Sequence, residues 1–154
     1  MVRLSEARIE PGALLAAFSE GRTETGAVVS FTGLVRAEGG AVGALVLEAY
    51  AGFTEAAIEA TAEAARTRFG LQDLTIVHRV GRVVPGEAIV FVATAAAHRR
   101  AAFEAADHLM DYLKSRAPFW KKSCGADGER WIEPAPQDYE DAARWDRRSP
   151  EPAP

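Results

Sequence analysis

The sequence predicts one α+β domain with a mainly antiparallel sheet and flanking helices. Strand-like and helix-like segments alternate over its 154 residues, and no internal repeat is present. The segment Val84-Pro85-Gly86-Glu87 separates two strand-like runs. Proline and glycine occupy the two central positions that a type II turn favours, so these runs should form an antiparallel hairpin. A hairpin among mixed elements favours α+β over a doubly wound parallel sheet.

Four segments are predicted to be strands. Each is rich in β-branched residues or alternates apolar with polar residues, and each is bounded by glycine, aspartate or proline. The last two form the hairpin, and the sequence "GRVV" between them is long enough for one further short strand. The four segments are residues 26–33, 43–50, 73–80 and 87–95.

Four other segments are predicted to be helical. In the second of them, Thr54 is the expected N-cap and Gly70 the expected end. The third should end near Arg116, because Pro118 disfavours helical geometry at the residue before it. The helical segments are residues 10–21, 53–70, 98–116 and 137–145.

Composition limits the classes of function. With 48% hydrophobic residues the chain can bury the core of one domain. We expect residues 1–145 to form that domain and residues 146–154, which end in "SPEPAP", to form a disordered tail. The 22 acidic and 18 basic residues give a net charge of −4, which argues against broad binding to nucleic acid.

The number and spacing of cysteine and histidine residues indicate which cellular compartment and which metal sites are expected. A single cysteine, Cys124, excludes an internal disulfide and a zinc site built on paired thiolates, so a reducing compartment is expected. No histidine pair has metal-ligand spacing with a carboxylate or thiol, and we expect no metal. No basic-plus-apolar leader opens the sequence, and no apolar run approaches the roughly 20 residues that span a bilayer. We therefore expect a soluble, cytoplasmic protein that binds no membrane.

The lysines are the first candidate site. All three lie within "MDYLKSRAPFWKKSC", at positions 114, 121 and 122, whereas arginine occurs fifteen times. A solvated helix end would explain cations here. Lysine differs from arginine in that its amine can lose a proton, and neighbouring cations should lower its pKa. A reactive amine beside an anion site is the sharper hypothesis, with Phe119 and Trp120 as a flat apolar surface for a planar ligand.

Two further basic clusters are candidates. Arg36 follows a strand that runs into a glycine-rich loop, whose amides and guanidinium suit a phosphate. His98, Arg99 and Arg100 open the third helix, where the macrodipole disfavours cations and favours an anionic ligand. In a continuous helix His98 lies about 24 Å from Lys114. Either they serve different sites, or a two-fold dimer brings one helix start to the other helix end.

The remaining histidines and the cysteine are weaker candidates. His78 lies in an apolar strand and His108 inside a helix, and we interpret both as structural. Cys124 lies in a polar segment without a paired cysteine, and we interpret it as incidental.

Residues 3–145 resemble the MoaE family, the large, catalytic subunits of molybdopterin synthase. The resemblance lies in "FTGLVR", "LEAY", "HRVG", "PGEAIVFV", "AHR" and "MDYLKSRAPFWKK". It implies an α/β-hammerhead fold and a central homodimer flanked by two small ubiquitin-like sulfur carriers of the MoaD type, a heterotetramer. The implied reaction converts cyclic pyranopterin monophosphate to molybdopterin, with sulfur delivered as a thiocarboxylate on the carrier's C-terminal Gly-Gly. No metal or redox cofactor is implied.

The resemblance also implies roles for individual residues. Lys114 and Lys121 match the catalytic lysines, and His98 with Arg99 match a binding pair that one subunit contributes to the other's site. Ser123 replaces the glutamate that is common in the family, which puts its role in doubt. The sequence contains no ubiquitin-like segment, so we expect the carrier to be a separate protein. The implied substrate-binding residues are Leu34, Val35, Arg36, His98, Arg99, Lys122 and Ser123, and the expected pocket lining is Phe31, Met110, Phe119 and Trp120.

Two rival interpretations remain open. The basic, aromatic segment suits a non-enzymatic module that docks an acidic protein tail or single-stranded nucleic acid. An inactive family member is the third interpretation, to which Ser123 points. A docking module would tolerate exchange of lysine for arginine, whereas the enzyme would not.

Overall fold

The computed structural model describes residues 1–147, so the expected tail lies outside the described residues from residue 148 onward. Its first sheet has the strand order β1-β4-β6-β2. Strands β1 and β4 are parallel, and the other neighbours are antiparallel. The strands are β1 Val2–Ser5, β2 Ala27–Leu34, β4 Asp73–Arg79 and β6 Ala88–Ala96.

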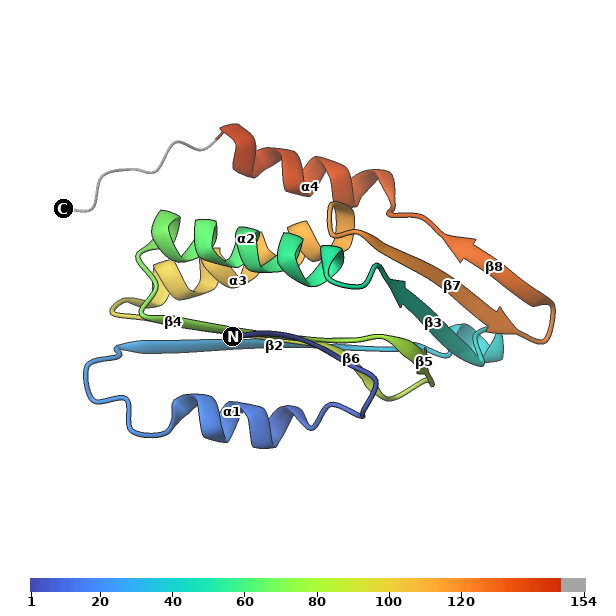
Figure 1. Ribbon diagram of the computed structural model, residues 1–154, viewed down its shortest axis with the longest axis horizontal. Helices are drawn as coiled ribbons and strands as arrows, with labels where there is room; N and C mark the ends of the chain where they lie inside the picture. The colour runs from blue at the N-terminus through green and yellow to red at the C-terminus, as the bar shows by residue number, and fades with distance from the viewer. Residues whose placement is uncertain (148–154) are drawn as a thin grey trace.

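Helices cover both faces of this sheet. Figure 1 shows α2 and α3 on one face, α1 on the other, and α4 outside the layer that α2 and α3 form. The larger apolar cluster lies between the sheet and the helices α2 and α3, and the smaller one lies between the sheet and α1. The helices are α1 Pro11–Ser19, α2 Phe53–Phe69, α3 Arg99–Ser115 and α4 Pro136–Arg147.

A second sheet extends away from the helical part, at the right of Figure 1. Its strand order is β5-β3-β7-β8, and all neighbours are antiparallel. A short 3-10 turn, Glu38–Gly40, lies in the loop that leads from β2 into β3. The strands are β3 Ala44–Ala49, β5 Gly81–Val83, β7 Phe119–Gly125 and β8 Gly128–Ile132.

The predicted α+β class is confirmed, and each predicted strand and helix is present with ends shifted by one or two residues. The turn at Val84 is also as predicted, because the Glu87 amide donates to the Val84 carbonyl over 3.1 Å and Gly86 has a φ of 87°. Strands β4 and β6 are antiparallel neighbours. The short strand between them, β5, leaves the first sheet and pairs with β3 in the second.

Strands β1, β7 and β8 were not predicted, and β7 is the most important because it carries two of the three lysines. Its segment was not among the predicted strands, and lysine is a residue that strands tend to avoid. Pairing overrides that preference, since β3 lies on one side of β7 and β8 on the other. The lysines at positions 121 and 122 therefore lie on a central strand.

The predicted N-cap of α2 is wrong. Gly52, with a φ of 73°, occupies the N-cap position, and Thr54 lies inside the first turn, fully buried. The Thr54 hydroxyl accepts from the Tyr50 amide and donates to the Pro118 carbonyl, each over 2.9 Å. This side chain therefore ties the start of α2 to the connection between α3 and β7. Gly70 ends the helix in the left-handed conformation, as predicted.

The last helix, α4, continues through residues 146 and 147, past the expected end of the domain at residue 145. The indole ring of Trp145 is buried against Phe69 of α2 and His108 of α3, at centroid distances of 5.8 and 5.2 Å. The Trp145 ring nitrogen donates to Asp111 of α3 over 2.6 Å. These contacts fix α4 against the half of α3 that carries Lys114.

Candidate active site

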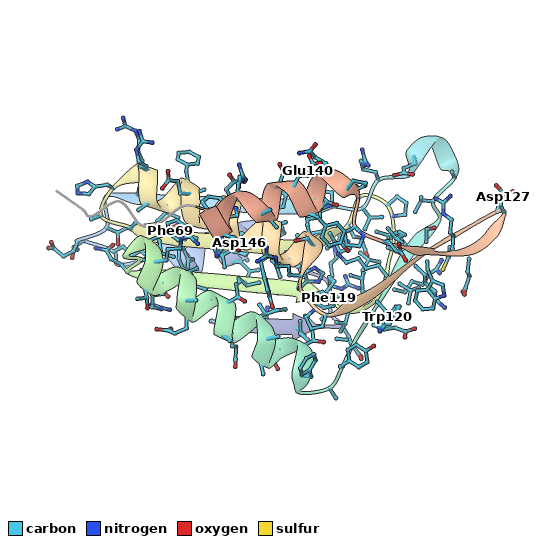
Figure 2. The ribbon with its side chains drawn as sticks, turned by 90° about the horizontal axis from the view of Figure 1, so that it is seen from above. Phe69, Phe119, Trp120, Asp127, Glu140 and Asp146 are labelled. Carbon is cyan, nitrogen blue, oxygen red and sulfur yellow. The ribbon has the colours of Figure 1, made fainter. Side chains whose placement is uncertain are left out.

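Strand β7 presents its side chains alternately to two faces of the second sheet. Phe119, Lys121 and Ser123 share one face, which is covered by the rest of the domain and on which Ser123 is buried. Trp120 and Lys122 share the opposite, open face, where Trp120 is 53% exposed. In Figure 2, Phe119 and Trp120 lie where the β7–β8 hairpin leaves the helical part, and Asp127 lies at its far tip. Adjacent residues of β7 therefore meet different surroundings.

Lys121 is the titratable group of the covered face. Its ammonium nitrogen lies 5.9 Å from the centroid of the Phe119 ring. The pKa of Lys121 is lowered from 10.5 to about 8, chiefly by burial and also by the charge of Lys114, while Asp138 acts in the opposite direction. With a pKa near 8, about one amine in ten is neutral at pH 7. Lys121 can therefore exchange a proton under neutral conditions.

Lys114 lies in the last turn of α3 and is exposed. It is near enough to Lys121 for its charge to affect the pKa of that residue. The structure thus brings together the two predicted catalytic lysines, although six residues separate them in sequence. This approach is possible because α3 ends at Ser115, three residues before Pro118, and the chain returns as β7 from Phe119.

Lys122 points away from this pair. Its ammonium binds Glu129 of β8 over 2.8 Å and lies 5.7 Å from the centroid of the Trp131 ring. The hydrogen bond to Glu129 raises the pKa of Lys122. The sequence predicted that the pKa of a lysine in this cluster is lowered; this holds for Lys121, whereas the pKa of Lys122 is raised. At Lys121 burial is a larger cause of this lowering than the neighbouring charge that the sequence indicated.

Ser123 and Cys124 continue the alternation along β7. The Ser123 hydroxyl is on the covered face and donates to the Arg130 carbonyl over 3.4 Å. The Cys124 thiol lies 3.7 Å from a carboxylate oxygen of Glu129, on the same side as Lys122. Neither contact places a sulfur or hydroxyl nucleophile beside Lys121.

The loop after β2 carries Arg36, whose side chain is 84% exposed and lies 3.3 Å from Glu38. Its neighbour Val35 is buried in an apolar cluster with Leu47 of β3. Leu47 pairs directly with Lys121, so the Arg36 loop and Lys121 border the same cluster. The Val35 side chain packs in the core, and its backbone amide and carbonyl are already bonded to Glu87 and Gly86, over 3.0 and 2.8 Å.

The predicted anion cradle of backbone amides in this loop is not formed as expected. The amides of Gly40 and Val42 both donate to the Ala37 carbonyl, over 2.9 and 3.0 Å, and the Gly43 amide donates to the Cys124 carbonyl over 2.8 Å. These donors are already used within the chain. Any phosphate contact from this loop must come chiefly from the Arg36 guanidinium.

His98 and Arg99 lie at the other end of α3, with His98 as its N-cap. Both are exposed and line an open pocket of about 610 Å³. A second pocket of about 430 Å³ adjoins it and is lined in part by Phe31 and Met110. Phe103 of α3 borders both pockets. Phe119 and Trp120, which were expected to line the same pocket as Phe31 and Met110, lie with the lysines instead.

The predicted site residues therefore form two groups within one chain. Helix α3 is continuous over 17 residues, so its length keeps His98 about 24 Å from Lys114, as the sequence predicted. Arg36 and Lys121 border one cluster, while His98 and Arg99 lie at the far end of the helix. One chain holds two separate parts of the predicted site.

Two residues near Lys121 were missed or underrated by sequence reasoning. Asp138 of α4 raises the pKa of Lys121 from a distant part of the sequence, and no motif indicated it. His78 of β4 was interpreted as structural, and its ring stacks on Phe119 with centroids 4.3 Å apart. Only the packing of the two sheets against each other reveals this neighbour.

Other site classes receive no support from residues 1–147. No helix in that part of the chain is long and apolar enough to cross a membrane. Within the same residues, histidine, cysteine and carboxylate side chains do not gather in groups of three that could hold a metal ion.

Comparison with known proteins identifies the family. The sequence model described as "MoaE protein" matches residues 4–116. The chain is 65% identical, over 97% of its length and 99% of the relative, to the molybdopterin synthase catalytic subunit of Caulobacter vibrioides. A solved MoaE protein from Burkholderia ambifaria is 43% identical with a TM-score of 0.79, covering 94% of this chain and 97% of that one.

A more distant structure has the same fold. The molybdopterin synthase structure from Staphylococcus aureus is 27% identical, with a TM-score of 0.75, and the match covers 84% of this chain and 94% of that one. The hammerhead-type α+β architecture is therefore shared beyond close relatives. The family model spans most of the chain, and the Caulobacter vibrioides relative matches nearly all of it, so this chain belongs to the MoaE family.

Proposed function

We propose that this protein is the catalytic subunit of a molybdopterin synthase and acts as a sulfurtransferase. It takes sulfur from the thiocarboxylated C-terminus of a small carrier protein and adds it to cyclic pyranopterin monophosphate, forming the dithiolene of molybdopterin. Family membership and the name of its relative support this activity. The reaction requires no metal or redox cofactor from this chain, because the carrier supplies the sulfur.

The observation that carries the proposal is the approach of Lys114 to Lys121. A partly buried amine with a pKa near 8 is suited to proton transfer at neutral pH, since catalytic efficiency is greatest when the pKa lies near the working pH. We assign proton acceptance to Lys121. The exposed ammonium of Lys114 provides positive charge where negative charge develops during sulfur transfer.

Substrate binding falls to the basic groups around this pair. Arg36 can clamp the substrate phosphate from the loop after β2, because a guanidinium offers paired donors to phosphate oxygens. Leu34, which is 57% exposed, offers apolar surface beside it. His98 and Arg99 add further donors, from the start of another subunit's α3.

That arrangement requires a homodimer. An exposed apolar strip runs along β2 and α3, comprising Phe31, Leu34 and Phe103 with exposures of 42%, 57% and 61%. Strand β2 is also an edge of the first sheet, with one side unpaired. Apolar surface on an edge strand is typical of an interface. A two-fold axis across this strip sets two α3 helices antiparallel, so that His98 of one copy approaches Lys114 of the other.

The sulfur carrier is a separate small protein of the ubiquitin-like MoaD type. Two carriers on a central dimer give a heterotetramer, in which each carrier tail ends at Lys114. The single cysteine of the chain fits a reducing, cytoplasmic setting. Neither nucleic acid nor a membrane is a partner in this proposal.

A reconstituted reaction tests the activity. Purified protein, thiocarboxylated carrier and cyclic pyranopterin monophosphate should yield molybdopterin, which is measured as its fluorescent oxidation product. Lys121→Arg keeps the charge and removes the titratable amine, and we expect it to lower turnover by about 100-fold or more while the carrier complex survives. Full activity in that variant would refute the assigned chemistry. It would favour the docking module, whereas a wild-type protein without activity would favour an inactive family member.

Subunit complementation tests the shared site. One variant lacks the side chains of His98 and Arg99 (both to Ala), and a second carries Lys114→Ala. In a mixed dimer one site receives both lesions and the other receives neither, so co-expression of the two inactive proteins should restore activity. Mixed dimers without activity, although each variant forms a dimer, would exclude a site shared between subunits.

A further inference from the structure

His78 is a buried histidine that the proposed reaction does not use. It lies near the end of β4 and is 3% exposed. Its Nδ1 lies 2.8 Å from the Arg79 carbonyl oxygen. A carbonyl can only accept, so Nδ1 carries the proton and the neutral ring leaves Nε2 unprotonated. The backbone contact therefore fixes the orientation of the imidazole.

The fixed imidazole supports the ring of Phe119. The two rings are stacked, with centroids 4.3 Å apart and planes 22° from parallel. His78 belongs to the first sheet and Phe119 opens β7 of the second, so the stack joins the two sheets. The Phe119 ring centroid also lies 5.9 Å from the Lys121 ammonium nitrogen. Phe119 thus contacts a fixed imidazole and lies close to the reactive amine.

We propose that His78 is a positioning residue for Lys121, holding the Phe119 ring in the place where it excludes water from the amine. The proposal rests on the proposed function only in calling Lys121 catalytic, and the arrangement of the three side chains stands without it. What the stack requires at position 78 is an uncharged aromatic ring in a fixed orientation.

The charges around the stack agree with this role. Burial lowers the pKa of His78 to about 4, with the backbone hydrogen bond raising it and the charge of Lys121 lowering it. The imidazole is therefore neutral at the pH where Lys121 titrates, and it adds no positive charge beside the amine. The charged groups that act on Lys121 come from two other elements, Lys114 of α3 and Asp138 of α4. His78 acts on Lys121 by packing and not by charge.

A direct titration of Lys121 tests the proposal without substrate or carrier. The chain has only three lysines, so full-length protein labelled with ¹³C at the lysine ε-carbon gives three signals. The Lys121 signal is identified by its loss in Lys121→Arg. In wild-type protein it should titrate near pH 8. His78→Leu removes the stack, and we expect this midpoint to rise by about 0.5 pH units or more as water reaches the amine.

Matched variants separate positioning from general damage. His78→Phe keeps a ring on Phe119 and should leave the midpoint near that of the wild type. His108→Leu removes the other histidine that packs among aromatic rings, between Phe69 and Trp145, and should also leave it unchanged. Phe119→Leu removes the ring itself and should raise the midpoint as His78→Leu does. This fourth variant keeps the test decisive if His78→Leu does not fold.

The result that would overturn the proposal is a Lys121 midpoint that stays at the wild-type value in folded His78→Leu or Phe119→Leu. An equal rise in His108→Leu would overturn it too, because the effect would then reflect loss of stability. Enzymatic assays add an independent readout, since the pH dependence of turnover should shift with the Lys121 midpoint in His78→Leu. If the wild-type protein is inactive and the midpoint still rises in His78→Leu, the proposed function is refuted and the positioning role stands.

Discussion

Lys121 and Lys122 are adjacent in sequence and opposite in environment. Lys121 faces the domain, packs near Phe119 and has a pKa lowered to about 8. Lys122 faces outward, binds Glu129 over 2.8 Å and has a raised pKa. The difference arises from strand geometry, because successive side chains of β7 point to opposite faces. It shows that an unusual cluster of lysines contains one group suited to proton transfer and one structural ion pair.

The largest expected difference between the two lysines concerns turnover. Lys121→Arg keeps a cation but cannot release a proton near neutral pH, so we expect sulfur transfer to fall by about 100-fold or more. Lys122→Arg keeps the ion pair with Glu129 and should retain most of the activity. Single-turnover rates with preformed thiocarboxylated carrier measure both. Equal losses of turnover in the two variants would contradict the different roles assigned to the two faces of β7.

Acid stability tests the buried layer behind Lys121. The folded-state pKa of His78, about 4, lies below the usual 6.5. Between these values the unfolded chain binds a proton that the folded chain does not, so stability is lost as the pH falls from 6.5 to 4. The full difference is on the order of 3 kcal/mol. Burial also lowers the pKa of His108, which adds loss in the same direction.

The contribution of His78 to this loss of stability is measured by comparison with His78→Phe, because the variant has no imidazole at position 78 to protonate. Urea unfolding at about pH 7 and about pH 4.5 should show a smaller loss of stability in the variant than in the wild type. If the two proteins lose the same free energy of unfolding, His78 does not resist protonation in the folded state.

Removing Lys121 should abolish activity but stabilise the fold at neutral pH, whereas removing Lys122 should not stabilise it. The folded-state pKa of Lys121 is depressed, so holding its proton at pH 7 costs folding free energy that vanishes once the pH exceeds about 10.5. Lys121→Met removes this cost, and we expect a gain of about 1–3 kcal/mol at pH 7. Lys122→Met loses the contact with Glu129 and should give no gain. Denaturant unfolding at pH 7 measures both, and a destabilised Lys121→Met would contradict a cost of holding the charge on this partly buried amine.

The smallest effect is expected at Cys124. Its thiol lies on the outward face near Glu129, and in the proposed reaction the sulfur comes from the carrier. Cys124→Ala should therefore leave turnover near the wild-type rate and change stability by only about 0.5 kcal/mol. Loss of activity in this variant would mean that the outward face also takes part in the chemistry.

Local patterns in the sequence predicted most of the fold. The helices α2 and α3 and the turn at Pro85-Gly86 follow from apolar spacing and turn residues, which act within a few positions. Strand β7 did not follow, because its strand conformation depends on pairing with β3 and β8 rather than on its own composition. The position of Thr54 likewise depends on a distant partner, the Pro118 carbonyl.

The candidate site was predictable only where it depends on local sequence patterns. The rarity of lysine singled out positions 114, 121 and 122, and the expected length of α3 was enough to separate His98 from Lys114. The opposite roles of Lys121 and Lys122 depend on which face of β7 is covered. The neighbours His78 and Asp138 come from β4 and α4, and only the packed structure brings them to Lys121 and its aromatic partner.

The pH dependence of single-turnover sulfur transfer tests the central claim most directly. If the neutral amine of Lys121 accepts a proton in the reaction, the rate should rise with pH and level off above about pH 8, where that amine is largely unprotonated. The rise should be absent from the residual activity of Lys121→Arg and present in Lys122→Arg. A wild-type rate that is constant from about pH 6.5 to 9.5, or a rise that survives in Lys121→Arg, would contradict the account.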